Sequence, residues 1–550
     1  MILRRILPVR SFCTHAPPEK KKPIWTAVVA GAVTSALYFK TRPDIKDESA
    51  YDVVDEEENV AKTNKTLDSY GCEVSGKPFY SAEEVSKHSS KKERIWVTFK
   101  SGVYDVTEFV DAHPGGDKIL MAAGGAVDPF WELYSVHLNP SVLQLLEEYR
   151  IGNVKAEDRI LPSSGSDHWG NEPMRHPSLA VRSQRPFNAE PPPSILTDHY
   201  ITPNSLFFVR NHLPVPVIDE EEYRLEISGF GIPEPVSLSL ADLKSRFPPH
   251  TLTSTIQCSG NRRSEMNKVK EVKGLFWGKA AISNATWTGV RLIDLLKACN
   301  ANLSDERIQH VELEGLDADP VQGSAYAASV PAERMLDPKA DVLIAYYMNG
   351  QPIPRDHGFP VRAIVPGIVG ARQVKWLGRI KLTNEESQSH WQQADYKGFH
   401  PSTDAKSADY SKAQAIQDYP IQSAICSPDE GEVLIPEKGF ITVKGYAWSG
   451  GGRAIIRVDV SMDGGKTWNE AELLPPQRKS LYKGWDWTLW QIKLPVGHVL
   501  KDNEEVSVDL VCKAVDSSYS TQPESFEGIW NFRGVLSNAW SRVNVKLAKG

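Results

Sequence analysis

The residues best suited to chemistry lie in one short stretch, residues 253–263, which reads T-S-T-I-Q-C-S-G-N-R-R. Its threonines and Ile256 favour a β-strand that ends at Cys258, just before the turn pair Ser259-Gly260. A thiol on a turn beside two arginines is predicted to be available as a thiolate, which is a good metal ligand. A lone cysteine is more often a small buried hydrophobe. Burying the adjacent arginines without partners would be costly, which disfavours an apolar core here.

A second candidate metal site is a pair of histidines. His113 is part of F-V-D-A-H-P-G-G, where the Pro-Gly-Gly run ends a helix and lets the backbone approach a flat ligand. His137 follows 24 residues later, and either histidine alone would more often be a surface or capping residue. Residues 70–155 resemble cytochrome b5, and this resemblance implies that His113 and His137 bind haem b from opposite faces. Two axial imidazoles leave no site for oxygen, so such a haem only transfers electrons.

Four basic stretches of the central region are a third candidate. They are residues 207–212 (F-F-V-R-N-H), 258–263 (C-S-G-N-R-R), 355–362 (R-D-H-G-F-P-V-R) and 370–376 (G-A-R-Q-V-K-W). Each could be a solvated or structural patch, but together they could form one pocket for an anionic cofactor and a small oxyanion. No G-x-G-x-x-G motif follows a predicted strand, which disfavours a Rossmann nucleotide site. Six cysteines without a C-x-x-C pair argue against a zinc site and a disulfide framework.

All four stretches resemble the molybdenum domain of the sulfite oxidase family, and the chain is identified as a member of its animal, haem-containing branch. This resemblance implies a molybdenum–molybdopterin cofactor, with Cys258 as the protein ligand of the metal. It implies that the pterin and its phosphate are bound by Phe207, Phe208, Val209, Arg210, Asn211, Asp317, His357, Arg362, Gln373, Val374 and Lys375. It also implies catalytic or anion-binding roles for Arg210, Arg263, Arg453, Tyr396, Trp277 and Lys273.

The length of the chain and the changes in its sequence pattern along the chain predict several domains. At 550 residues it is too long for one hydrophobic core. We expect a presequence with a hydrophobic sorting segment and an acidic connector (1–68), a cytochrome b5-like haem domain (69–155), a flexible linker (156–167), a mixed α+β molybdopterin domain (168–402) and an immunoglobulin-like dimerisation sandwich (403–550). The predicted fold class is therefore multidomain α+β.

Hydrophobic periodicity places the main elements of these domains. It predicts a helix over residues 289–298 and strands over 95–99, 207–210, 223–228, 310–313, 342–347 and 361–365. Alternating strands over 456–460, 506–513 and 541–549, with a hairpin signal at Asp463-Gly464, predict the sandwich. Residues 461–468, S-M-D-G-G-K-T-W, match the sialidase Asp-box, which we interpret as a turn device without catalytic function.

The N-terminal region has the charge pattern of a targeting sequence. Residues 1–43 carry a charge of +7, which leaves −14 for the rest of the chain. Residues 1–13 are arginine-rich and amphipathic, as in mitochondrial presequences. The sixteen uncharged residues 24–39 are short for a membrane span, which needs about 20. We expect sorting to the mitochondrial intermembrane space, with no stable membrane insertion of the mature form; a single-span anchor is the alternative. The net charge of −7 gives no support for nucleic-acid binding.

The family resemblance implies oxidation of sulfite to sulfate, with electrons leaving singly through haem b to cytochrome c in a homodimer joined by the C-terminal domain. Two alternatives stay open. One is a nitrate-reductase-like molybdoenzyme, although nitrate reductases place the molybdenum domain first. The other is a haem-b electron-transfer or binding protein with an inactive central domain.

The haem region also has an uneven charge. Between Asp105 and Glu132 there are six acidic residues and one basic residue. A solvated acidic face is the plain interpretation. The functional one is an acidic haem edge that docks alternately on the arginine-rich pocket and on basic cytochrome c, with residues 156–167 as its tether.

Overall fold

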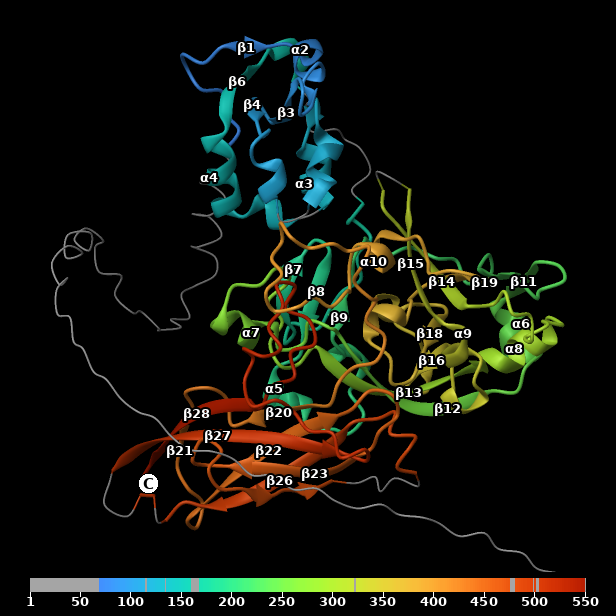
Figure 1. Cartoon of the computed structure of the whole chain (residues 1–550), viewed down its shortest axis with the longest axis vertical. Helices are drawn as coiled ribbons and strands as arrows, with labels where there is room; N and C mark the ends of the chain where they lie inside the picture. Colours follow the sequence, from blue (N-terminus) through green and yellow to red (C-terminus); the bar gives the residue numbers. More distant parts are fainter. Residues whose placement is uncertain are drawn as a thin grey trace, which may run out of the picture. The chain divides into compact units, whose positions relative to one another are not determined.

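The computed structural model describes residues 69–113, 116–133, 135–159, 168–320, 323–474, 480–497, 499–500 and 504–549 (Figure 1). The predicted presequence, the acidic connector and residues 160–167 of the predicted linker lie outside these ranges. Within them, no helix combines the length and the apolar character that a membrane span requires.

Residues 69–159, blue to cyan in Figure 1, form a small sheet covered by short helices. The strand order is β1 (Phe79–Tyr80), β6 (Arg150–Val154), β4 (Gly102–Asp105), β3 (Arg94–Phe99) and β2 (Ser89–Ser90), and β5 (Gly125–Ala126) pairs with β3. The helices are α2 (Ala82–Ser86), α3 (Asp128–Leu133), α4 (Pro140–Glu148) and the 3-10 helices η1 (Val110–Ala112), η2 (Gly116–Ala122) and η3 (Ser135–Leu138). Ser81 and Asn139 cap α2 and α4 through their side chains.

The first residues of the predicted linker are ordered. They form the 3-10 helix η4 (Ala156–Asp158), and the Asp158 carboxylate accepts a hydrogen bond of 3.0 Å from the backbone N–H of Ala82 at the start of α2. Arg159 forms an ion pair with Glu73. Two residues of the predicted linker, Asp158 and Arg159, are therefore bonded to the haem domain.

Residues 168–402, mostly green and yellow in Figure 1, contain three sheets with short helices. One sheet has the order β11 (Val236–Ser239), β10 (Arg224–Gly229), β19 (Leu377–Thr383), β14 (His310–Ala318) and β15 (Ala325–Pro331). The next has β12 (His250–Gln257), β13 (Ile282–Arg291), β16 (Leu343–Met348) and β17 (Gln351–Pro352), with β18 (Arg362–Ile364) on β16, and the last has β7 (Ala180–Gln184), β8 (Phe187–Glu190) and β9 (Val209–Arg210). The helices are α5 (Pro193–Leu196), η5 (Asn204–Leu206), α6 (Leu240–Ser245), α7 (Arg263–Val269), α8 (Leu292–Ala298), α9 (Ala332–Met335), η6 (Pro338–Ala340), η7 (Arg355–His357), η8 (Gly370–Arg372) and α10 (His390–Gln393).

Two predicted elements of this region differ from the structure. The helix predicted over residues 289–298 starts only at Leu292, because β13 continues to Arg291 and its Gly289 pairs with Ala345 of β16. A Cβ at Gly289 would lie 2.0 Å from the Ile344 carbonyl oxygen, so the glycine permits this close strand contact. The strand predicted over 207–210 is reduced to β9, which follows η5.

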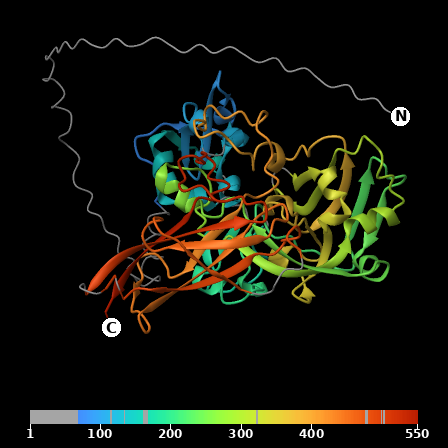
Figure 2. The same cartoon turned by 60° about the horizontal axis from the view of Figure 1, so that its bottom comes forward.

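Residues 420–548, orange to red in Figures 1 and 2, form a β-sandwich, as predicted. One sheet has the order β20 (Gln422–Ser427), β22 (Phe440–Trp448), β26 (Thr488–Pro495) and β25 (Glu472–Leu473). The other has β21 (Val433–Leu434), β28 (Ser541–Ala548), β27 (Glu505–Asp516), β23 (Ile455–Ser461) and β24 (Asn469–Glu470). Inward-facing residues of both sheets, such as Val443 and Leu510, share one core.

The Asp-box-like segment is a turn between β23 and β24, as interpreted from the sequence. The Asp463 carboxylate accepts hydrogen bonds from the N–H groups of Lys466 and Thr467, both at 2.9 Å, and from the Thr467 hydroxyl at 2.7 Å. These bonds close the loop after β23, which is the role of an Asx-type turn.

Candidate active site and haem site

Cys258 follows the last residue of β12, as predicted, and its loop is fixed by backbone hydrogen bonds. The Cys258 N–H donates to Ala281 O at 2.9 Å, and the Asn261 N–H donates to Cys258 O at 3.0 Å. The side chain is 6% exposed and belongs to the lining of a cavity. The loop is therefore a tight turn that presents one thiol to an internal space.

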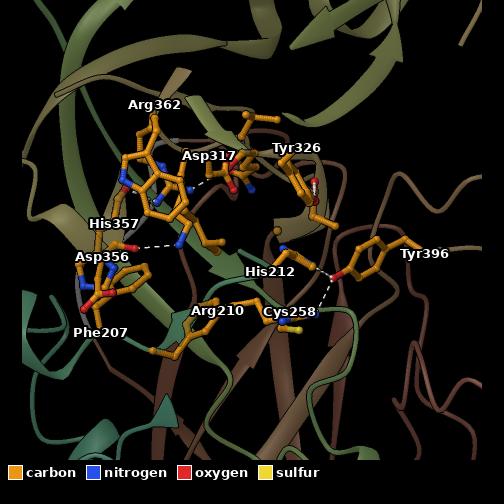
Figure 3. A pocket seen from close by; sticks show the side chains of 18 residues that line it. Phe207, Arg210, His212, Cys258, Asp317, Tyr326, Asp356, His357, Arg362 and Tyr396 are labelled. Carbon is orange, nitrogen blue, oxygen red and sulfur yellow. Dashed lines mark hydrogen bonds between the residues drawn. The ribbon is translucent and has the colours of Figure 1, made fainter. Parts of the chain in front are cut away.

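The cavity, shown in Figure 3, contains about 660 Å³ of space that no protein atom fills, including some that is open to solvent. Of the predicted residues, its lining includes Phe207, Phe208, Arg210, Cys258, Asp317, His357, Arg362, Gln373, Val374, Lys375 and Tyr396. The basic stretches around 207–212, 258–263, 355–362 and 370–376 thus meet at one place, from β9, the end of β12, η7, β18 and the loop after η8.

Several wall atoms fit a large polar ligand. Asp317 Oδ1 and Arg362 Nε are buried and have no hydrogen-bond partner among the described residues. Buried polar groups of this kind normally have a partner, which a ligand can supply. Gly370 also lines the cavity, and a Cβ there would lie 2.9 Å from Gln257 O, so the wall has no room for a side chain. The residues present therefore fit a bound molybdopterin cofactor.

Burial dominates the electrostatics of this wall. It raises the pKa of Asp317 to about 7, against the opposing effect of Lys375, and it lowers the pKa of Lys375 to about 7. It also lowers the pKa of His357 to about 4 and that of Arg362 to about 9. An anionic ligand would favour the charged forms of Lys375 and Arg362, so this end of the cavity is suited to a phosphate.

A polar cluster lies at the other end, near Cys258. Arg210 Nη2 donates to the Tyr396 hydroxyl at 3.2 Å, and His212 Nε2 is hydrogen-bonded to the same hydroxyl. Burial raises the pKa of Tyr396 to about 12, although Arg210 opposes the shift. Tyr396 has a left-handed backbone with a φ of 49°, which is uncommon for a residue other than glycine and marks a constrained position.

Five further predicted residues are not part of the lining of the cavity. Asn211 is buried, donates to Asp356 Oδ1 at 3.1 Å and accepts from Lys375 Nζ. Trp277 is buried against Phe208, with ring centroids 6.5 Å apart. The others are Val209, Lys273 and Arg263.

Arg263 is held at the back of the Cys258 loop. Its guanidinium donates to the carbonyl oxygens of Arg533 (3.0 Å), Gly534 (3.1 Å) and Leu275 (2.8 Å). Burial lowers its pKa to about 10; the charges of Arg533 and Arg210 act in the same direction, while Cys258 and Tyr396 oppose them. Arg263 therefore lies within electrostatic reach of the thiol and of both other arginines.

The prediction for Arg453 does not agree with the structure. Its guanidinium forms an ion pair of 3.2 Å with Asp516 and donates to Ser449 Oγ, both in the sandwich, and it does not line the cavity. Arg533 is a sandwich arginine closer to the site, although it does not line the cavity either: it pairs with Asp395, beside Tyr396, and its charge acts on Arg263 and Lys273. Burial lowers the pKa of Arg533, but Asp395 outweighs this effect and the net shift is upward.

Sequence reasoning missed further lining residues. His212 and Asp356 belong to two of the basic stretches, so a signal for them was present. Tyr326 lines the cavity from β15, where an apolar strand pattern gave no sign of it.

The two predicted haem ligands face each other. The rings of His113, at the end of η1, and His137, in η3, are 6.2 Å apart between centroids and only 12° from parallel. Two imidazoles bound to one metal at about 2 Å each, with about 1 Å from nitrogen to ring centre, require about 6 Å. The pair therefore fits bis-histidine ligation of a haem iron.

The predicted acidic haem edge is partly neutralised. Asp105 forms an ion pair with Arg94, and Asp111 pairs with Lys91 at 2.6 Å. Arg94 and Lys91 lie before residue 105, so they are outside residues 105–132, over which the six acidic residues and one basic residue were counted. Glu108, whose side chain is 82% exposed, remains the clearest outward charge of this edge, with Arg94 Nη1 3.9 Å away.

Comparison with known proteins defines the class. Residues 81–155 match the "Cytochrome b5-like Heme/Steroid binding domain", residues 212–391 the "Oxidoreductase molybdopterin binding domain" and residues 413–548 the "Mo-co oxidoreductase dimerisation domain". The protein is thus a molybdopterin oxidoreductase with a cytochrome b5-like domain. These matches confirm the predicted fold class and both predicted cofactors, molybdenum–molybdopterin and haem.

Within this class the chain belongs to the sulfite oxidase family. It is 56% identical over 470 residues to the mitochondrial sulfite oxidase of Rattus norvegicus, covering 85% of this chain and 84% of that protein. It is 52% identical over 476 residues to the mitochondrial sulfite oxidase of Drosophila melanogaster, covering 86% and 81%. The crystal structure of the sulfane dehydrogenase from Paracoccus pantotrophus is similar, with a TM-score of 0.52 and 26% identity over 70% of this chain and 91% of that one.

Proposed function

We propose that this protein oxidises sulfite to sulfate at a molybdenum–molybdopterin centre and passes the electrons singly through haem b to cytochrome c. The observation that carries the proposal is the single cavity in which Cys258 lies between a phosphate-suited end and a cluster of arginine and tyrosine. The family membership supports the substrate, since relatives covering most of the chain are named sulfite oxidases.

Within the cavity the residues divide into two groups. Asp317, His357, Arg362 and Lys375, with the other predicted pterin residues, would hold the cofactor. Cys258 would be the protein ligand of the metal. When bound, the cofactor supplies a two-electron oxidation with oxygen transfer, and haem b supplies single-electron steps.

Arginines would bind the sulfite dianion. Arg210 and Arg263, with Arg533 in place of Arg453, provide planar donors in a largely desolvated site, where charge-assisted hydrogen bonds are strong. Trp277 would form part of the wall of the anion pocket through its packing on Phe208, and Lys273 would add a nearby positive charge. The overall reaction converts sulfite and water into sulfate, two protons and two electrons.

The Tyr396–His212 pair can hold a proton near the reacting atoms. The Tyr396 hydroxyl accepts from Arg210 Nη2 and is hydrogen-bonded to His212 Nε2, so the phenol and the imidazole can share a proton. With its raised pKa, Tyr396 stays protonated at neutral pH and acts as a donor.

The remaining parts of the proposal concern assembly and location. The match to a dimerisation domain supports a homodimer through residues 403–550, and we retain 69–155, 156–167 and 168–402 as the haem, linker and molybdopterin regions. The names of the relatives support a mitochondrial protein, and the two-part N-terminal pattern supports the intermembrane space.

The test is metal analysis with two alternative substrates. We expect molybdenum and haem in equal amounts, reduction of cytochrome c that depends on sulfite, and no oxidation of a reduced donor when nitrate is added. Haem without molybdenum in a folded protein would favour an electron carrier with an inactive central domain. Turnover of nitrate without sulfite oxidation would favour the nitrate-reductase-like alternative.

A further inference from the structure

Arg262, four residues after Cys258, occupies an unusual position. It is completely buried, with 0% exposure, and its backbone is left-handed with a φ of 63°. Non-glycine residues rarely adopt this conformation, and a buried guanidinium is costly unless it is fully paired. An arginine at this place therefore needs strong compensation from its surroundings.

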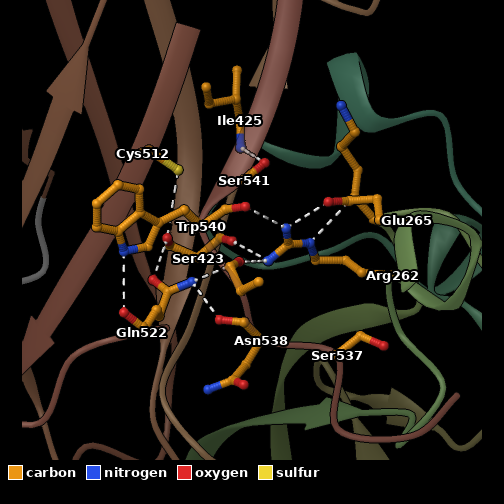
Figure 4. Close-up of polar contacts among 12 residues, drawn as sticks. Arg262, Glu265, Ser423, Ile425, Cys512, Gln522, Ser537, Asn538, Trp540 and Ser541 are labelled. Carbon is orange, nitrogen blue, oxygen red and sulfur yellow. Dashed lines mark hydrogen bonds and ion pairs between the residues drawn. The ribbon is translucent and has the colours of Figure 1, made fainter. Parts of the chain in front are cut away.

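Most of that compensation comes from the sandwich (Figure 4). Arg262 Nη1 donates to Ala539 O at 2.6 Å, to Gln422 Oε1 at 2.8 Å and to Ser423 O at 3.1 Å. Nη2 donates to Trp540 O at 3.2 Å. Two of these acceptors belong to β20 and the other two, on Ala539 and Trp540, to the loop before β28, so all four are far along the chain from the Cys258 loop.

Glu265 supplies the charge partner. Its carboxylate accepts from Arg262 Nε at 2.9 Å and from Nη2 at 2.5 Å, so every nitrogen of the guanidinium is engaged. Burial lowers the pKa of Arg262, but Glu265 outweighs this effect and the net shift is upward. The Arg262 side chain is therefore a charged group, with every guanidinium nitrogen hydrogen-bonded, buried between the molybdopterin domain and the sandwich.

One residue of the sandwich, Gln522, holds the acceptors of Arg262 in place through its side chain and its backbone carbonyl. Gln522 Nε2 donates to the carbonyl oxygens of Asn538 (3.0 Å) and Ala539 (3.2 Å), and Gln522 O accepts from Trp540 Nε1 at 3.0 Å. The Ser423 hydroxyl donates to Gln522 Oε1 at 2.6 Å. The surface that receives Arg262 is therefore braced by hydrogen bonds within the sandwich itself.

Other residues of the same turn also bind the sandwich. Asn261 Nδ2 donates to the Tyr446 hydroxyl at 2.8 Å, and Ser259 O accepts from the Leu536 N–H at 2.8 Å. On its other side the turn presents Cys258 to the cavity. The turn after Cys258 is thus hydrogen-bonded to the sandwich on one side and presents the thiol to the cavity on the other.

We propose that Arg262 is a positioning residue that locks the turn after Cys258 onto the sandwich, so that this domain sets the place of the thiolate at the cavity wall. The proposal rests on the proposed function only in taking Cys258 as the metal ligand. It gives the sandwich a second role, next to the dimerisation for which the matched domain is named.

The test compares three variants of the full-length holoenzyme. Arg262→Lys keeps the charge but loses the fork of donors, and Gln422→Met removes one acceptor on the sandwich side only. Lys483→Met is the matched control, because the 2.7 Å ion pair of Lys483 with Asp341 joins the same two domains away from the turn. The readouts are the electron paramagnetic resonance spectrum of the molybdenum centre, kcat, KM for sulfite and the thermal midpoint.

We expect a changed spectrum and a kcat reduced about ten- to a hundredfold in Arg262→Lys, since small displacements at a reacting centre have effects of this size. KM should change far less. Gln422→Met should shift the spectrum in the same direction but by less, because three backbone acceptors remain. Lys483→Met should match the wild type in spectrum and kcat.

A wild-type spectrum and kcat in both Arg262→Lys and Gln422→Met would overturn the proposal. If Arg262→Lys does not retain molybdenum, Gln422→Met decides alone. If the wild type lacks molybdenum or sulfite oxidation, the proposed function fails separately, and the rate of Cys258 alkylation becomes the readout. Faster alkylation in both variants than in the wild type would support the lock, and equal rates would overturn it.

Discussion

Gly534 offers a quantitative test of how Arg263 is held. Its φ is 57°, and a Cβ there would lie 2.7 Å from Arg263 Cγ, 2.8 Å from Val272 Cγ2 and 3.0 Å from Arg263 Nε. Real Cβ atoms do not approach other heavy atoms this closely, so Gly534→Ala must displace the arginine or the loop.

Two costs add for this substitution. The left-handed backbone costs about 1–2 kcal/mol for alanine. The overpacking costs about 1–3 kcal/mol more. If Arg263 then loses one charge-assisted contact with sulfite, worth about 1.5–3 kcal/mol, KM should rise about ten- to a hundredfold.

Gly431→Ala is the matched control, because Gly431 has a φ of 76° and no atom within 4 Å of its would-be Cβ. It should show only the backbone cost of about 1–2 kcal/mol and an unchanged KM. The assays are denaturant unfolding and steady-state sulfite kinetics. Equal stability losses in the two variants, with KM unchanged in both, would refute the view that packing against Gly534 positions Arg263.

Three further predictions concern other residues. His137→Ala should abolish cytochrome c reduction but keep sulfite-dependent reduction of ferricyanide, since the two metals act in series; equal loss with both acceptors would mean a folding defect. Arg453→Gln should cost about 1.5–3 kcal/mol of stability through its bond to buried Asp516 and leave KM for sulfite unchanged; a raised KM would return Arg453 to the site. For His357, whose pKa burial lowers to about 4, the unfolded chain takes up a proton near pH 6.5, so stability should fall as pH drops from 6.5 to 4; His357→Gln should flatten this dependence, which pH-resolved unfolding would show.

Much of the site could be predicted because its signals are local. The strand that ends at Cys258 and the basic stretches that meet at the cavity each occupy a few consecutive residues. A resemblance in such short motifs carries over well. The two haem-ligand candidates, His113 and His137, could also be predicted from the sequence, because the H-P-G-G motif is typical of the cytochrome b5 fold.

The choice of sandwich arginine could not be made from the sequence. Arg453 follows three glycines and Arg533 precedes one, so both look like loop arginines with a close backbone approach. Which of them lies close to Arg263 depends on how the sandwich packs against the Cys258 loop. That packing is set by contacts between residues more than 100 positions apart, such as Arg262 with Ala539.

The prediction that residues 289–291 begin a helix was wrong for a related reason. Local spacing favoured a helix, but Gly289 to Arg291 are paired with β16, which lies over 50 residues later. Strand pairing of this kind overrides local propensity, because it satisfies backbone groups that would otherwise be buried unpaired.

The central claim is most directly tested by mixing the purified protein anaerobically with sulfite and following the haem absorbance. The account predicts that sulfite alone reduces the haem in the wild type. It predicts that in Cys258→Ser the haem stays oxidised with sulfite but is still reduced by dithionite. Haem that stays oxidised in molybdenum-loaded wild type, or that sulfite reduces as fast in Cys258→Ser, would contradict the account.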